Sequence, residues 1–121
     1  MKAVIALDHG RLAVREAAID APRAGEVLIR MAAAGVCHSD LSVLEGTVPM
    51  PLPMVLGHEG SGVVQQLGAG VTGLAVGDHV AVSFVPACGT CRWCSTGRQY
   101  LCDNGAKLFD MGMMSDGREA H

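Results

Sequence analysis

The sequence predicts a mainly β fold, a partly open barrel of short strands with short helices. Three observations favour it. Apolar runs are short, 16 glycines punctuate the chain, and no helical periodicity extends beyond about two turns. Of the 121 residues, 50% are hydrophobic and 17% are charged, which is typical of globular proteins and not of disordered ones. The length allows one modest domain.

Three strands are expected in the first part of the chain. Residues 2–7 and 12–17 are apolar runs separated by Asp8, His9 and Gly10, which is the composition of a turn. Residues 26–33 predict a third strand. Its apolar residues alternate only in part, which indicates a partly buried position.

A short helix and an irregular segment are expected next. Within residues 37–46, Ser39 is a candidate N-cap for one or two helical turns, and Gly46 can end them in the left-handed conformation. Three prolines among residues 49–53 exclude regular structure there.

Two further strands are expected before the chain becomes loop-like at residue 86. Residues 57–67 form the first, with Gly60 and Gly62 where bulges or close backbone approaches occur. Residues 78–85 form the second.

Charge and hydropathy exclude several partners. Nine Lys and Arg against 12 Asp and Glu give a net charge of −3 without any basic cluster, which excludes nucleic acid and a membrane surface as expected partners. Residues 1–7 are apolar but meet Asp8 at once, unlike a signal peptide. The longest uncharged stretch, residues 60–77, carries repeated glycines and does not suit a membrane helix. We therefore expect a cytoplasmic protein.

Four of the five cysteines lie close together in a segment that we expect to form a zinc lobe at about residues 86–105. The spacing C-x2-C-x2-C-x7-C is formed by Cys88, Cys91, Cys94 and Cys102. Two residues between ligands allow a turn to aim both sulfurs at one ion, and four thiolates complete the tetrahedral shell of a structural zinc. Trp93 is expected to pack within this lobe.

Two alternatives to zinc exist for the lobe. A ferredoxin-type iron–sulfur cluster needs a cysteine and then a proline where this sequence has Arg98 and Gln99. A disulfide pair is the other alternative, and the expected compartment disfavours it.

The fifth cysteine belongs to a second set of potential ligands. Cys37 lies some twenty residues before His58 and Glu59. Together they offer thiolate, imidazole and carboxylate, an open-sided zinc site. Taken singly, a cysteine is more often a small buried hydrophobe and a histidine more often packs. From spacing alone, both interpretations stay open.

Several motifs occur in one order and at matching spacings between residue 1 and about residue 105. They are Cys37-His38-Ser39-Asp40, Gly57-His58-Glu59, the following Gly62, Gly68 and Val71, Gly77-Asp78-His79-Val80, and the four-cysteine spacing. In these motifs the sequence resembles the N-terminal, GroES-like catalytic domain of zinc-containing alcohol dehydrogenases of the medium-chain dehydrogenase/reductase superfamily.

The resemblance implies metal ligands. Cys37 and His58 would ligate a catalytic zinc, with Glu59 as an alternate ligand beside it. Asp40 would accept the second ring N–H of His58 and so fix its tautomer. The four cysteines of the lobe would hold a structural zinc.

The resemblance also implies an activity, which is interconversion of small alcohols with aldehydes or ketones by hydride transfer. Ser39 would take the proton of the substrate hydroxyl into a relay. His38 would contact the pyrophosphate of the cofactor, NAD or NADP in the full-length parent. That parent is expected to be a homo-oligomer.

Two family features are missing from the sequence. The family's third ligand to the catalytic zinc is a cysteine well downstream of the lobe, and this sequence has none after Cys102. It also lacks a G-x-G-x-x-G motif in the right context. We therefore expect residues 1–121 to form an incomplete, truncated domain, with no Rossmann domain present and no activity alone. The alternative is a stand-alone, non-catalytic zinc-binding or interaction module.

Overall fold

The structure is a computed structural model that describes residues 1–105 of the chain. The chain divides into two compact units, Met1–Val82 and a second unit that begins at Ser83. Among the described residues, the first unit holds the strands and the α-helix, and the second holds two short 3-10 helices.

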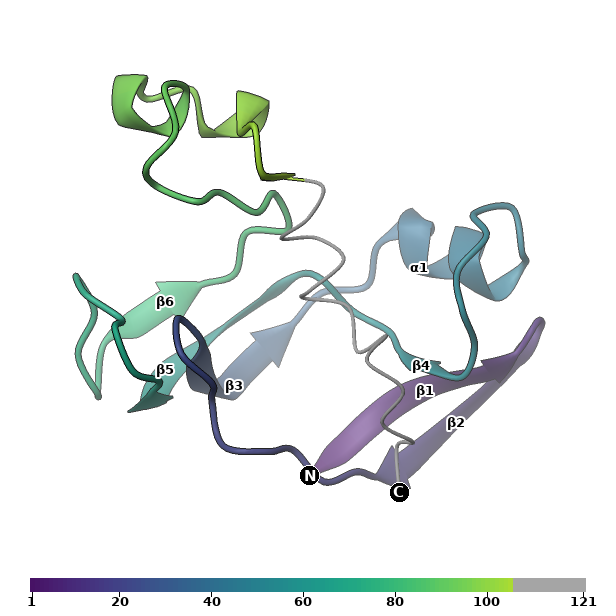
Figure 1. Cartoon of the computed structure of the whole chain (residues 1–121). Helices are drawn as coiled ribbons and strands as arrows, with labels where there is room; N and C mark the ends of the chain where they lie inside the picture. Colours follow the sequence, from purple (N-terminus) through teal and green to yellow (C-terminus); the bar gives the residue numbers. More distant parts are fainter. Residues whose placement is uncertain (106–121) are drawn as a thin grey trace. The chain divides into compact units, whose positions relative to one another are not determined.

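The first sheet is built around an N-terminal hairpin. Strands β1 (Lys2–Asp8) and β2 (Arg11–Glu16) pair antiparallel, and β4 (Met54–Val55) pairs with the other edge of β1, giving the order β2-β1-β4 (Figure 1). Gly10 adopts a φ of 72° in the hairpin turn, a conformation that glycine enters without steric penalty.

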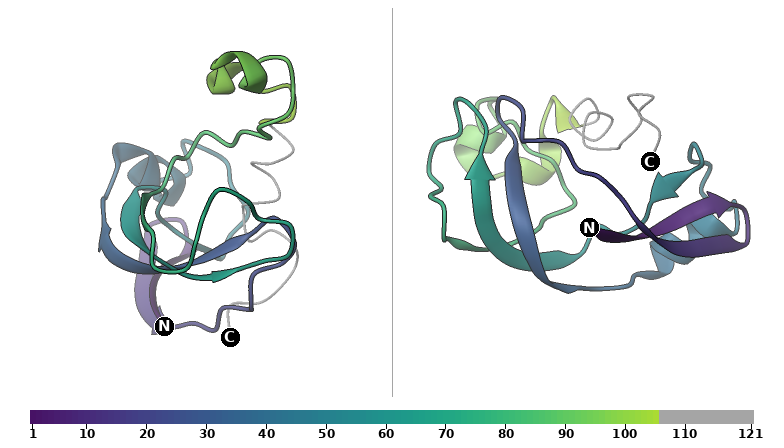
Figure 2. Two further views of the ribbon diagram at one scale, coloured as in Figure 1. Left: turned by 90° about the vertical axis from the view of Figure 1, so that its left-hand side faces the viewer. Right: turned by 90° about the horizontal axis from the view of Figure 1, so that it is seen from below.

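The second sheet contains the longest strand pair. Strand β5 (Gly60–Leu67) lies between β3 (Val27–Ala34) and β6 (His79–Ala81), and all pairs are antiparallel. The register between β3 and β5 shifts twice, and Figure 2 shows both strands bent, as expected at bulges. A Cβ on Gly62 would collide with the backbone of Arg30, so the predicted close backbone approach is confirmed.

The helix α1 (His38–Leu44) has Cys37 as its N-cap. The prediction that Ser39 caps the helix is therefore wrong: Ser39 lies in the first turn. The helix starts earlier because Cys37 N–H donates to Asp40 Oδ2 at 2.9 Å, which satisfies a backbone group at the helix start. Gly46 has a φ of 78° just after the helix, so the predicted left-handed ending is confirmed.

The mainly β class is confirmed, while some boundaries were wrong. The strand expected over residues 78–85 is shortened to β6, and the strand expected from residue 57 begins only at Gly60, because Gly57 takes a φ of 119°. The short strand β4 was missed, since its pairing with β1 is a long-range contact that no local pattern reports. The 3-10 helices η1 (Cys94–Thr96) and η2 (Gln99–Leu101) lie in the segment expected to be a loop.

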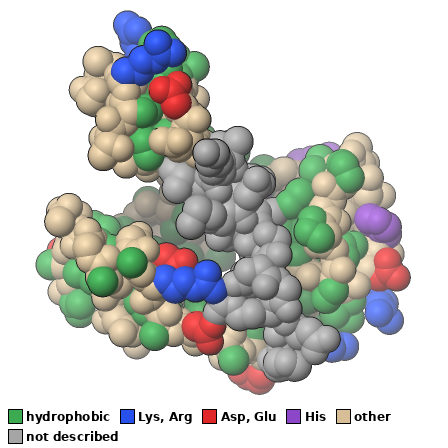
Figure 3. Space-filling model, viewed as in Figure 1, with side chains coloured by type: hydrophobic (Ala, Val, Ile, Leu, Met, Phe, Trp, Pro, Cys, Tyr) green, Lys and Arg blue, Asp and Glu red, His purple; other side chains and the backbone are tan. Residues whose placement is uncertain are grey.

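The buried core of the first unit is small. Its central cluster consists of Ala3, Ile5 and Ala17, with Leu7 and Val55 packed against it, and most of these residues belong to strands of the first sheet. Many other apolar side chains stay exposed, and Figure 3 shows hydrophobic side chains at the surface among charged ones. Within residues 1–105, no helix has the length and apolar character needed to cross a membrane.

Candidate metal centres

The four cysteines of the second unit form one compact donor set. The sulfurs of Cys88, Cys91, Cys94 and Cys102 all lie within 4.8 Å of one another. Sulfurs bound at about 2.3 Å around a tetrahedral zinc would be about 3.8 Å apart. The set therefore fits a four-thiolate zinc site with little adjustment.

Local backbone structure brings these sulfurs together. Cys91 N–H donates to Cys88 Sγ at 3.3 Å, and Cys88 N–H donates to Cys102 Sγ at 3.4 Å. Gly89 and Gly97 have φ values of 76° and 78°, which let the chain turn sharply between ligands. These N–H···S contacts orient the donors toward one another.

The pKa values of two thiols in the lobe are shifted in opposite directions. Hydrogen bonds from the Thr90 backbone, the Thr90 hydroxyl and Asn104 lower the pKa of Cys88 to about 5. Burial raises the pKa of Cys94 to about 12, because a thiolate in an apolar, dehydrated position is unfavourable. A bound cation would offset the cost of that buried charge.

The second donor set is assembled from two distant segments of the first unit. Donor atoms of Cys37, His58 and Glu59 lie within 4.8 Å of one another. Cys37 precedes α1, whereas His58 and Glu59 precede β5. One sulfur, one imidazole nitrogen and one carboxylate oxygen leave room for a further ligand, which is the arrangement of catalytic rather than structural zinc sites.

Asp40 connects the two segments of this second set. Its Oδ2 accepts the hydrogen bond from Cys37 N–H at 2.9 Å, and its Oδ1 lies 3.3 Å from His58 Nδ1. A carboxylate at Nδ1 leaves Nε2 as the ring nitrogen available to a metal.

Ser39 lies beside the same imidazole. Its Oγ is 3.2 Å from His58 Nε2. Hydrogen bonds with the side chain and backbone of Ser39, and then with His58, lower the pKa of Cys37. The hydrogen bond with Cys37, assisted by the charge of Asp40, raises the pKa of His58. The two pKa shifts together favour a Cys37 thiolate beside a positively charged His58. A metal ion bound at Cys37 would supply a positive charge at the same place.

His38 is exposed and is not part of the three-donor set. It is the first residue of α1, and its Nδ1 lies 3.4 Å from Ser42 Oγ, one helical turn later. Of the predicted site residues, the structure thus brings together Cys37, Ser39, Asp40, His58 and Glu59. His38 lies in the same helical turn but outside the donor set.

One residue of this site was missed by the sequence analysis. Gly35 N–H donates to the Glu59 carbonyl at 3.1 Å, and a Cβ on Gly35 would collide with Glu59 Oε2. The absence of a side chain at position 35 therefore leaves room for the Glu59 carboxylate. No pattern in a single sequence marks this glycine among the others.

Two open antiparallel sheets, a four-cysteine lobe and a separate Cys–His–Glu set define a β domain with two candidate zinc centres. The model of the alcohol dehydrogenase GroES-like domain matches residues 23–119. The chain belongs to this family, and the GroES-like fold class expected from the sequence is confirmed.

Named relatives and solved structures agree with this assignment. The chain is 57% identical over 99 residues to putative alcohol dehydrogenase D of Mycobacterium tuberculosis, covering 82% of this chain. It is 53% identical over 100 residues, 83% of this chain, to NDMA-dependent alcohol dehydrogenase of Amycolatopsis methanolica. It spans 27% of the length of each relative. An alcohol dehydrogenase zinc-binding domain protein from Burkholderia ambifaria superposes with a TM-score of 0.83 at 44% identity, over 98% of this chain and 32% of that one.

Proposed function

We propose that this chain is the N-terminal, zinc-binding catalytic portion of a zinc-dependent alcohol dehydrogenase. One observation carries the proposal: a chain of the alcohol dehydrogenase GroES-like family contains both a closed four-sulfur donor set and an open Cys–His–Glu set. A closed set suits a structural metal, and an open one suits a metal that must also contact substrate.

The open set would hold the catalytic zinc through Cys37 and His58, with Glu59 as an alternate ligand. When bound, zinc supplies Lewis-acid polarisation of an alcohol or carbonyl oxygen. Asp40 keeps the proton of His58 on Nδ1, because its Oδ1 lies 3.3 Å from that nitrogen. The lowered pKa of Cys37 favours the thiolate that a metal requires.

Ser39 and His38 are proposed to act on substrate and cofactor. Ser39 Oγ, which contacts the imidazole from the first turn of α1, would carry the proton of the substrate hydroxyl as a neutral relay. His38 would contact the cofactor pyrophosphate, while Ser42 restrains its ring. A nicotinamide cofactor, NAD or NADP, supplies the hydride acceptor or donor in the longer parent.

The remaining assignments follow from the family and the sequence. Residues 86–105 would be the structural zinc lobe of the domain. The substrates would be small alcohols and aldehydes, and the parent would be a cytoplasmic homo-oligomer. The negative net charge of the chain supports a function without nucleic acid or membrane partners.

The proposal is tested by Cys37→Ser in a longer dehydrogenase that carries this domain. We expect turnover to be lost while one zinc per chain remains in the lobe. Cys102→Ser is the complementary variant, which should lose the zinc that Cys37→Ser retains. Retained turnover in Cys37→Ser would contradict the proposal.

A further inference from the structure

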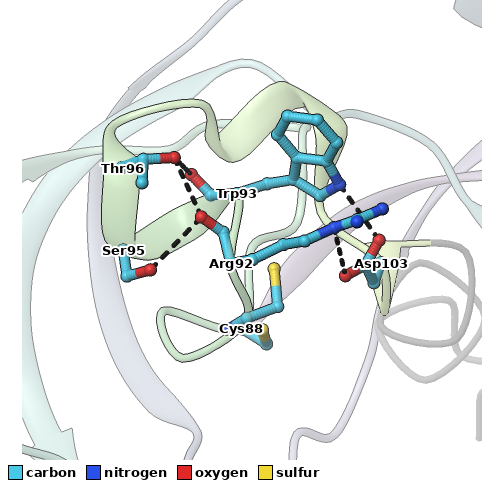
Figure 4. Close-up of polar contacts among 7 residues, drawn as sticks. Cys88, Arg92, Trp93, Ser95, Thr96 and Asp103 are labelled. Atoms are coloured by element: carbon cyan, nitrogen blue, oxygen red, sulfur yellow. Dashed lines mark hydrogen bonds and ion pairs between the residues drawn. The ribbon is translucent and has the colours of Figure 1, made fainter.

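A side-chain contact joins two separate parts of the four-cysteine lobe. Trp93 lies between Cys91 and Cys94, and Asp103 directly follows Cys102. Trp93 Nε1–H donates a hydrogen bond to Asp103 Oδ1 at 3.1 Å, and Figure 4 shows the indole nitrogen facing that carboxylate. The contact therefore links the short ligand turn to the one ligand that is distant in sequence.

Arg92 contacts both residues of this pair. Its guanidinium lies over the Trp93 ring, 4.6 Å from the centroid, and its Nε is 3.8 Å from Asp103 Oδ2. The exposed fractions of these two charged side chains are 75% and 49%, so the ion pair adds little by itself. The neutral-to-charged hydrogen bond from the indole is the stronger contact.

The backbone that carries Trp93 is itself held in place. Thr96 Oγ1 donates to the carbonyl of Arg92 at 2.8 Å, and Arg98 N–H donates to the carbonyl of Trp93 at 2.8 Å. Figure 4 shows the Thr96 hydroxyl and the Trp93 indole on the same short segment. An anchored segment can position a partner, whereas a mobile one cannot.

The fourth ligand is the one that needs such an anchor. Cys102 is separated from Cys94 by the longest gap of the ligand set, and closing a longer loop costs more conformational entropy. A contact that closes the same loop reduces the loop-closure entropy that zinc binding alone must offset.

We propose that the Trp93–Asp103 hydrogen bond is a positioning contact that holds Cys102 against the other three sulfurs and slows the loss of zinc. The inference rests on the proposed zinc binding by the lobe. Neither side chain belongs to the four-sulfur donor set, so both act through the position of Cys102. Supporting residues around metal ligands typically change affinity by about 10–100-fold, and the partial exposure of Asp103 places this contact near the lower end.

The test compares zinc release from the zinc-loaded 121-residue chain to a chromogenic chelator. Trp93→Phe and Asp103→Ala each remove the hydrogen bond and should release zinc about tenfold faster than wild type. Asp103→Asn keeps an oxygen acceptor for the indole N–H but removes the charge that faces Arg92. It should release zinc at a rate between those of wild type and Asp103→Ala, because the neutral acceptor keeps the hydrogen bond but loses its charge assistance. Tyr100→Phe, which removes a hydroxyl from an exposed aromatic side chain of the same lobe, is the matched control.

Cobalt loading separates positioning from damage. The charge-transfer and ligand-field bands of a four-sulfur cobalt site should be the same in all variants, because no ligand is altered. A changed spectrum in Asp103→Ala would mean an altered ligand set and would overturn the inference. Equal release rates in zinc-loaded wild type and Asp103→Ala would also overturn it, as would release from Asp103→Asn as fast as release from Asp103→Ala. A wild-type chain that binds no zinc in the lobe would instead overturn the proposed zinc site, and the inference with it.

Discussion

The two donor sets of this chain differ in how their ligands are brought together. The lobe takes all four sulfurs from one short segment, Cys88 to Cys102, and orients them by N–H···S contacts within that segment. The open set joins Cys37, at the start of α1, to His58 and Glu59, which precede a strand.

This difference indicates which part of the fold each site depends on. The lobe needs only its own segment and a metal, so a substitution there should act locally. The open set depends on packing between α1 and the segment before β5, with Asp40 and Ser39 both contacting His58. It also mixes ligand types and leaves a position open, as catalysis requires.

The largest expected effect is loss of the lobe's metal in Cys94→Ser. The substitution removes one of four thiolates from a buried position, so zinc affinity should fall by more than the about 10–100-fold typical of supporting residues. Zinc titration followed by limited proteolysis should show weak binding and cleavage within the lobe. Cys37→Ser is the matched control and should leave the lobe uncleaved. Equal cleavage of the lobe in both variants would contradict the prediction that its metal depends on Cys94 and not on Cys37.

Zinc binding by the lobe should strengthen with pH. The Cys94 thiol, with its pKa raised to about 12 by burial, keeps its proton at neutral pH and must lose it to bind zinc. Affinity should therefore rise at least about tenfold per pH unit near neutrality. Cys88, with its pKa lowered to about 5 mainly by the Thr90 backbone, adds a further competing proton only below about pH 5. Calorimetry in buffers of different ionisation enthalpy counts the protons, and a pH-independent affinity would contradict this.

Asp40→Asn should weaken the open site and spare the lobe. An asparagine can accept from Cys37 N–H or from His58 Nδ1–H, but its single oxygen serves both poorly. If its amide faces the ring, the His58 proton moves to Nε2 and blocks ligation. The weaker zinc-binding event should lose about 10–100-fold in affinity, measured by calorimetry. Asp78→Asn, which alters a carboxylate that accepts from Ala75 N–H, is the control and should change neither event.

Gly35→Ala should have a smaller effect on the same site. The added methyl collides with Glu59 Oε2, so the carboxylate must move away from the other donors. We expect the weaker zinc event to lose affinity by less than in Asp40→Asn. In a Glu59→Gln background, Gly35→Ala should add nothing, since both substitutions act on one group. Additive losses would show that Gly35 acts by another route.

The smallest effect is expected for Arg92→Ala. Its ion pair with Asp103 is 3.8 Å long and mostly exposed, and its stacking on Trp93 is at the surface. Both contacts together should change the free energy of unfolding of the zinc-loaded chain by less than about 1 kcal/mol. Thermal unfolding checks this value, and a loss as large as that of Cys94→Ser would refute the ranking.

The two sites were not equally predictable from the sequence. The lobe was readable because its ligand spacing is local, so Cys88 to Cys102 indicated a metal site without any knowledge of the fold. The Cys37–His58–Glu59 set was ambiguous from spacing and gained weight only through the family resemblance. These three residues lie close together because segments distant in sequence pack against each other, and only the structure shows their donor atoms within 4.8 Å of one another.

The misses have the same physical origin. The strand β4 and the role of Gly35 depend on partners distant in sequence, and the indole–carboxylate contact of Trp93 depends on a turn of backbone that the cysteine spacing implies only loosely. The helix N-cap was misplaced by two residues, because Asp40 rather than Ser39 satisfies the backbone at the helix start.

The zinc content of the purified chain after dialysis against a moderate chelator shows whether the four-cysteine lobe holds a structural zinc and the Cys37 set a weaker one. We expect close to one zinc per chain in wild type and in Cys37→Ser, and none in Cys88→Ser, because the closed four-sulfur site holds the ion that dialysis does not remove. Iron in place of zinc, or a surviving zinc that depends on Cys37 and not on Cys88, would contradict it.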